Sequence, residues 1–67
     1  MSNIKKLRVS MGLSQKAWAK ALGIGQSAVS HWERGVSQPS VPIAFKMSKL
    51  GARAGIFYSP EELRKLP

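Results

Sequence analysis

Apolar residues recur at helical spacing along this chain, and a glycine ends each of the first three apolar series. The first series consists of Ile4, Leu7 and Met11. Ser2 or Asn3 can cap this helix, and Gly12 stands where a left-handed C-cap is favoured. The pattern therefore predicts a short helix near the start of the chain.

A second short helix is predicted from Ser14, its N-cap, through Leu22, with Gly23 as its stop. Its helical wheel has a core-facing side and a polar side: Trp18, Ala21 and Leu22 against Lys16 and Lys20. We expect the first side to pack in the core and the second to meet solvent or phosphate.

A third helix is predicted to start at Gly25 or Gln26 and to stop at Gly35. Over about 140° of its wheel, at 100° per residue, it carries only polar side chains: Gln26, Ser27, Ser30, His31 and Arg34. The opposite side carries Ala28, Val29 and Trp32. Two short helices joined by a tight glycine turn are the layout of a helix-turn-helix, whose second helix enters the DNA major groove.

A fourth helix follows the loop sequence at 37–40, with Ser40 as its cap and Pro42 in its first turn. Its apolar members are Ile43, Ala44, Phe45, Met47 and Leu50. Gly51 and Gly55 are both plausible ends of this helix.

The last segment is predicted to form a fifth helix that runs through Leu66 and ends at Pro67. Its start is a capping box, because Ser59 stands at the N-cap and Glu62 three residues later, with Pro60 between them. The fold expected is an all-α, five-helix bundle. The alternative is an α+β fold, in which residues 55–58 form a strand that pairs between two copies.

Charge strengthens the prediction of a polyanionic partner. The chain has 11 Lys and Arg against 3 Asp and Glu, a net charge of +8 on 67 residues. Residues 1–53 carry all of this excess, and the remaining segment is neutral. Such a balance favours nucleic acid as the partner, and phosphate contacts would make affinity fall steeply with salt. The neutral tail is expected to have another task.

Composition also excludes several classes of protein. There is no cysteine, so disulfides and thiolate metal sites are ruled out, and a lone His31 makes no metal cage. No nucleophile and base pair is apparent, which argues against an enzyme. No apolar run approaches the roughly 20 residues that span a bilayer. We therefore expect one soluble cytoplasmic domain over residues 1–67, with no cofactor, small-molecule ligand or membrane contact, stabilised by oligomerisation.

A family resemblance rests on a set of spaced residues: Leu13-Ser14-Gln15, Ala19, Leu22-Gly23-Ile24, Val29-Ser30, Trp32-Glu33, Gly35 and Pro39-Ser40. Over about residues 4 to 50 the chain resembles the lambdoid phage repressor and Cro type of helix-turn-helix protein, the XRE-like group. It is most like a small Cro protein. The resemblance implies a phage or prophage repressor that binds a palindromic operator as a homodimer, in association with the nucleoid of a bacterial or infected cell.

The resemblance also implies roles for individual residues. Base edges would be contacted by Gln26, Ser27 and His31, and Gln15 would bind the DNA backbone and brace them. Arg8 and Glu33 would form a buried ion pair. From the wheel and the charge we add Ser30 as a base contact, and backbone contacts at Lys16, Arg34, Lys46 and Lys49.

Two interpretations of the tail remain open. Residues 52–67 either make the homodimer, with Ile56, Phe57 and Tyr58 as its interface, or close the core of their own subunit. The main function predicted is a Cro-type repressor of transcription. The alternative is an antitoxin and autoregulator that uses the same DNA-binding helices and whose tail, from Ala52 onward, binds a toxin protein.

Overall fold

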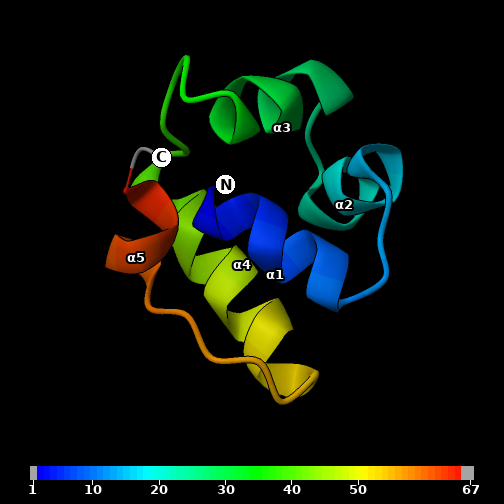
Figure 1. The fold of residues 1–67 in the computed structure, drawn as a ribbon, viewed down its shortest axis with the longest axis vertical. Coiled ribbons are helices and arrows are strands. Elements are labelled where there is room, and N and C mark those ends of the chain that lie inside the picture. Colours follow the sequence, from blue (N-terminus) through cyan, green and yellow to red (C-terminus); the bar gives the residue numbers. More distant parts are fainter. Residues whose placement is uncertain (1, 66–67) are drawn as a thin grey trace.

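Five helices make up the computed structural model, which describes residues 2–65 (Figure 1). They are α1 (Asn3–Ser10), α2 (Gln15–Leu22), α3 (Gln26–Glu33), α4 (Val41–Arg53) and α5 (Pro60–Arg64). No strand occurs in the described residues, so the all-α prediction is confirmed. Residues 56–59 are an irregular connection, and the alternative of a strand at 55–58 is not found there.

Serine side chains cap four of the helices, as the sequence predicts. Each hydroxyl accepts a hydrogen bond from the backbone N–H three residues later, which supplies one of the partners that a helix start lacks. The four pairs are Ser2 with Lys5 at 3.0 Å, Ser14 with Ala17 at 3.0 Å, Ser40 with Ile43 at 3.4 Å and Ser59 with Glu62 at 3.0 Å. The remaining helix, α3, follows Gly25, and no side chain caps its start.

By sequence Gly51 and Gly55 are both plausible ends of α4, and the helix ends close to Gly55. The helix runs past Gly51 to Arg53, and Gly55 then takes a φ of +78°. That left-handed conformation is strained for other residues and costs glycine little. The connection to α5 therefore begins at Gly55.

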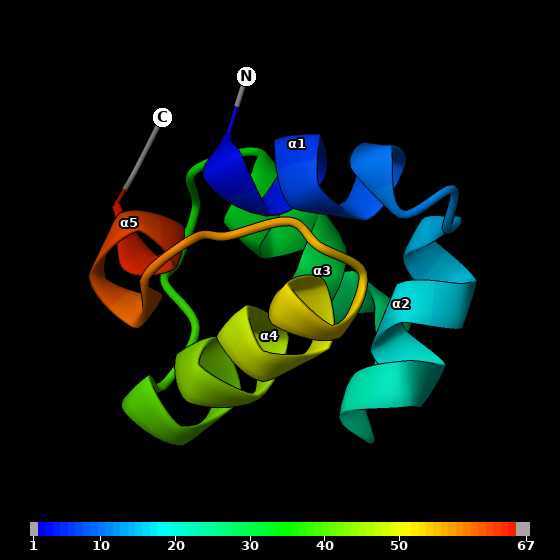
Figure 2. The ribbon, with the colours of Figure 1, turned by 90° about the horizontal axis from the view of Figure 1, so that it is seen from below.

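The core receives side chains from all five helices. Its fully buried members include Ile4, Leu7, Trp18, Ala19, Leu22, Val29, Trp32, Met47 and Leu63. Both tryptophans are buried, with exposed fractions of 0% for Trp18 and 7% for Trp32, which confirms their predicted place in the core. Seen from below, α1 and α4 lie on opposite sides of this core, with α2 and α5 at its two ends (Figure 2).

One predicted core position is wrong, and one apolar residue of α4 is exposed. Ala21 is exposed and Ala19 is buried in its place. Phe45 is 53% exposed, whereas its neighbour Ala44 is fully buried. At 100° per residue, Phe45 lies about 160° from Met47 around α4, so the helix that buries Met47 must turn Phe45 outward.

The start of α5 has the predicted capping box. Ser59 and Glu62 exchange hydrogen bonds between side chain and backbone, both 3.0 Å long. The backbone N–H of Ser59 donates to the carboxylate, and this hydrogen bond holds the pKa of Glu62 below its ordinary value. Leu63, one residue later, is buried in the core. The predicted continuation to Leu66 lies outside the described residues.

A close approach fixes the path of the chain after α4. Gly51 is buried, and its carbonyl accepts a 2.9 Å hydrogen bond from the backbone N–H of Ile56. A Cβ at residue 51 would lie 2.9 Å from both the Ile56 carbonyl oxygen and Leu7 Cδ1. Glycine is therefore required here by packing. In residues 2–65 no helix has the length and hydropathy needed to cross a membrane.

We expect Gly51→Ala to destabilise the fold by up to about 2 kcal/mol, an overpacking cost of about 1–3 kcal/mol less the gain in helix propensity. The added methyl group overpacks the contact with Ile56 and Leu7, and this cost exceeds the gain of about 1 kcal/mol in helix propensity. Thermal unfolding followed by circular dichroism measures the change. Ala52→Ser, at an exposed position in the same turn, is the control and should melt close to wild type. A Gly51→Ala variant that melts at or above the wild-type temperature would contradict the packing argument.

Candidate nucleic-acid interface

A tight turn joins α2 to α3 and sets the angle between them. Gly23 ends α2 with a φ of +72°, and the Ile24 N–H donates to the Ala19 carbonyl at 3.0 Å. Trp18 and Leu22 from α2 then meet Val29 and Trp32 from α3 in the core. The two helices are held together by buried apolar surface, and the outer side of α3 lies at one end of the molecule (Figure 1).

The outer side of α3 carries the polar arc predicted from the sequence. Its exposed members are Gln26, Ser27, His31 and Arg34, and Ser30 is half-buried. The amide of Gln26 can pair bidentately with adenine, and serine hydroxyls can donate or accept at several base edges. Glu33 is turned into the protein, so the arc carries no negative charge. The arc therefore combines hydrogen-bonding groups with a surface that does not repel phosphate.

Behind the arc lies an ion pair between α1 and the end of α3. Arg8 Nε donates to Glu33 Oε2 at 2.7 Å, and Arg8 Nη2 donates to Oε1 at 3.1 Å. Only 13% of the Arg8 side chain and 5% of the Glu33 side chain are exposed. Arg8 Nη1 also donates to the Leu13 carbonyl at 2.8 Å, so the guanidinium fixes the loop before α2 as well.

Gln15 joins this group rather than the polar arc. Its Nε2 donates to Glu33 Oε1 at 3.2 Å. In the described residues it makes no hydrogen bond to Gln26, Ser27 or His31. The resemblance led us to expect that Gln15 braces the base-contacting residues. In the structure it braces Glu33 instead, at the far end of α3 from Gln26.

The predicted backbone-contacting cations do not form one cluster with the arc. Lys16 lies in the first turn of α2 and Arg34 directly follows α3. Lys46 and Lys49 lie on α4, which leads away from α3, and the C-terminal half of α4 is at the opposite end of the molecule (Figure 1). Lys46 Nζ donates to the Leu22 carbonyl at 3.5 Å. Lys49 is therefore distant from the surface that α3 presents.

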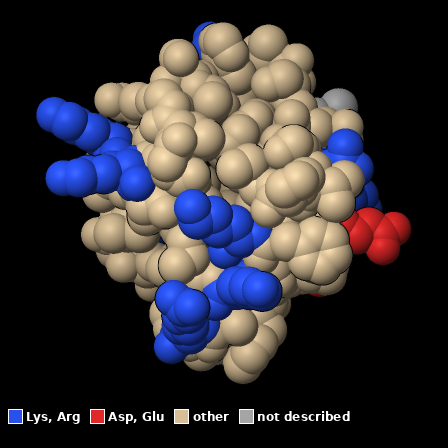
Figure 3. Space-filling view, turned by 180° about the vertical axis from the view of Figure 1, so that it is seen from behind, with Lys and Arg blue, Asp and Glu red and all other residues tan. Residues whose placement is uncertain are grey.

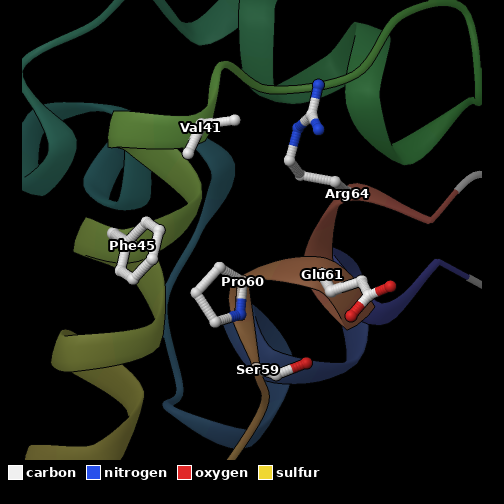
Figure 4. A pocket seen from close by; sticks show the side chains of 6 residues that line it. All are labelled: Val41, Phe45, Ser59, Pro60, Glu61 and Arg64. Atoms are coloured by element: carbon white, nitrogen blue, oxygen red, sulfur yellow. The ribbon is translucent and has the colours of Figure 1, made fainter.

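Sequence reasoning missed two features of the surface. The first is that exposed Arg53 adds a further cation to α4. Figure 3 shows lysine and arginine side chains spread over one face of the molecule. The second is a groove of about 370 Å³ between α4 and α5, lined by Val41, Phe45, Ser59, Pro60, Glu61 and Arg64 (Figure 4). The helical phase of Phe45 against Met47 was the signal that could have revealed this groove.

The apolar run of the tail divides between core and surface. Ile56 and Tyr58 are half-buried and pack against the core of their own chain. Phe57 is 79% exposed. Of the three residues predicted for a dimer interface, only Phe57 presents most of its surface. Among residues 2–65 there is no group of histidines and acids that could hold a metal ion.

Replacing Glu33 by Gln tests the ion pair. The substitution leaves the Arg8 charge buried without its partner, and we expect a loss of about 3–5 kcal/mol in the free energy of unfolding, measured by denaturant titration. The control is Glu61→Gln, an identical change at an exposed site, where we expect less than about 0.5 kcal/mol. Equal effects of the two substitutions would show that the pair contributes nothing.

Comparison with known proteins supports the geometry just described. A family model for the helix-turn-helix matches residues 4–51. Neither the curated proteins nor the solved structures include a significant match. The matched range contains all of α2 and α3 and most of α1 and α4. The chain therefore belongs to the XRE-type helix-turn-helix family, a family of DNA-binding regulators of transcription.

Proposed function

We propose that the protein is a sequence-specific repressor of the Cro type, which binds a palindromic operator in duplex DNA as a homodimer. The observation that carries this proposal is the polar arc of α3, which is exposed while Val29 and Trp32 anchor the same helix in the core. A rigid helix with one apolar and one hydrogen-bonding side suits insertion into the major groove.

In this function, α3 contacts base edges through Gln26, Ser27, Ser30 and His31. Lys16, in the first turn of α2, and Arg34, directly after α3, neutralise phosphates beside the groove. Gln15 can bind a phosphate with the part of its amide that Glu33 leaves free. Base contacts provide the choice of sequence and phosphate contacts hold the helix in register.

The apolar groove between α4 and α5 is the surface we assign to the second copy. Val41 and Phe45, one turn apart on α4, are 47% and 53% exposed. Two molecules of charge +8 repel one another over most of their surface. Glu61 lies on the rim of this groove, in the neutral part of the chain. The groove is thus the apolar surface that two copies can approach with least repulsion.

The groove is also mechanically joined to α3. Arg64 Nε donates to the Pro39 carbonyl at 3.0 Å, and Gln38 Nε2 donates to the Arg64 carbonyl at 2.7 Å. These bonds tie α5 to the loop that leaves α3. A twofold axis beside the groove would therefore fix the distance between two copies of α3, which must be about 34 Å to meet successive major grooves.

Repression then follows from occupancy, because a dimer bound across a promoter excludes RNA polymerase. The alternative function, an antitoxin, would use the same arc for DNA and would place a toxin protein in the groove instead of a second copy. Sedimentation of the purified chain separates the two, since only the repressor needs to pair with itself.

Alanine substitution of the arc tests base recognition. For the double variant Gln26→Ala/Ser27→Ala we expect a loss of about 2–4 kcal/mol of discrimination between a duplex selected from a random pool and random duplex, since each good base contact contributes about 1–3 kcal/mol. Binding to random duplex should change little. If both affinities fall by the same factor, α3 does not contact bases through these residues.

Phe45→Ser tests the dimer. We expect the variant to sediment as a monomer at concentrations where wild type pairs, and to bind a palindromic site at least tenfold more weakly. Val9→Ser removes an apolar side chain that is 55% exposed on α1, far from the groove, and is the control. A strict 1:1 complex of wild type on a palindrome would refute the homodimer. Loss of pairing in Phe57→Ser but not in Phe45→Ser would move the interface to the connection before α5.

A further inference from the structure

The helices α2 and α4 carry exposed cations and contain no acid. Four of these cations are what we call the basic face: Lys20, Lys46, Lys49 and Arg53. Among the charged side chains on the face in Figure 3, lysine and arginine prevail, and acids appear only at its edge. Glu33 is paired with Arg8, and the other two acids lie in the first turn of α5. The face is therefore uncompensated.

The three cations of α4 are aligned. Lys46, Lys49 and Arg53 fall within about 60° of the helical wheel, spaced by three and four residues. Like charges at these spacings repel one another, and this repulsion offsets the gain that cations bring near the C-terminal end of a helix. No hydrogen bond or ion pair within residues 2–65 compensates Lys49 or Arg53. Their charges are therefore free to meet a polyanion.

The spacing of these three aligned cations, which we call the stripe, suits a phosphate backbone. Seven residues of helix separate Lys46 from Arg53, a distance of about 10 Å along the axis. One strand of B-DNA presents a phosphate about every 3.4 Å of its helix axis. The stripe can therefore follow a short run of phosphates on a single strand. The C-terminal end of α2 lies close to Lys46, whose Nζ donates to the Leu22 carbonyl.

Lys49 and Arg53 lie away from the polar arc. Along the longest dimension of the molecule, 28 Å, α3 lies at one end and the C-terminal half of α4, which carries both residues, at the other (Figure 1). A straight duplex seated against α3 is therefore at the opposite end of the molecule from these two cations. The positive surface on α4 is thus separate from the surface that selects sequence.

We propose that the basic face is a second DNA-binding surface, which holds the phosphates of another duplex segment while α3 occupies the operator. This inference rests on the proposed function, because it takes duplex DNA as the partner of α3. The second segment is bound without regard to sequence, since lysine and arginine contact only its backbone. The protein thereby links its operator to flanking or neighbouring DNA.

A recruitment assay tests the second surface. A duplex selected for binding is immobilised and saturated with protein, and a fluorescent random duplex is then added. Wild type should retain the random duplex. Lys49→Gln/Arg53→Gln should bind the immobilised duplex yet lose most of this retention, and its affinity for random duplex should show a salt slope smaller by about 1.8, or 0.9 for each contact. Circular dichroism checks that the variant is folded.

The matched control is Lys5→Gln/Lys6→Gln, which removes the same charge from exposed positions on α1, across the core from α4 (Figure 2). It should recruit as wild type does. Equal losses of recruitment in the two double variants would show that the effect comes from net charge alone, which would overturn the proposal. Unchanged recruitment by Lys49→Gln/Arg53→Gln would overturn it as well.

Three other outcomes are separable. Binding to vesicles of phosphatidylcholine and phosphatidylserine that is lost in Lys49→Gln/Arg53→Gln, while this variant still recruits random duplex as wild type does, would assign the face to lipid and overturn the proposal. Failure of wild type to bind the immobilised duplex at all would instead refute the proposed function. Normal discrimination by wild type with no recruitment would refute the second surface alone.

Discussion

The position of α3 depends on one buried ion pair. Glu33 at the end of α3 receives Arg8 from α1 and Gln15 from α2, so a single carboxylate joins three helices. The apolar core brings these helices together through contacts that are not directional. The bidentate contact, 2.7 Å and 3.1 Å, adds direction. The same contact neutralises Glu33, the acid closest to the polar arc of α3.

Charge is distributed so that neighbouring surfaces favour different contacts. The arc of α3 is polar and without acid, α2 and α4 carry uncompensated cations, and the groove beside α5 combines apolar side chains with both signs of charge. A molecule of 28 × 22 × 22 Å has little surface to divide. Helices of eight to thirteen residues make the division possible, because each turns one side to the core and another to a different partner.

Local chemistry made the helix starts predictable, and packing decided what local chemistry left open. A serine hydroxyl or a left-handed glycine acts within four residues, so Ser14 and Gly23 could be assigned from sequence. Phe45 could not, because an apolar residue on α4 is buried or exposed according to where Met47 points. Gly51 looked like a helix stop, and only the approach of Ile56 and Leu7 shows that it is a contact. The separation of Lys49 from α3 likewise depends on the direction of α4.

Leu63 lies beyond the matched range of residues 4–51 and is nevertheless among the most deeply buried side chains, 1% exposed. It shares the core with Leu7 and Met47, which belong to that range. The stretch of sequence that resembles other proteins is therefore smaller than the stretch that must fold together. A fragment that contains only this stretch would expose the apolar side chains against which Leu63 packs. In this protein the family match and the cooperatively folding unit therefore extend over different lengths of the chain.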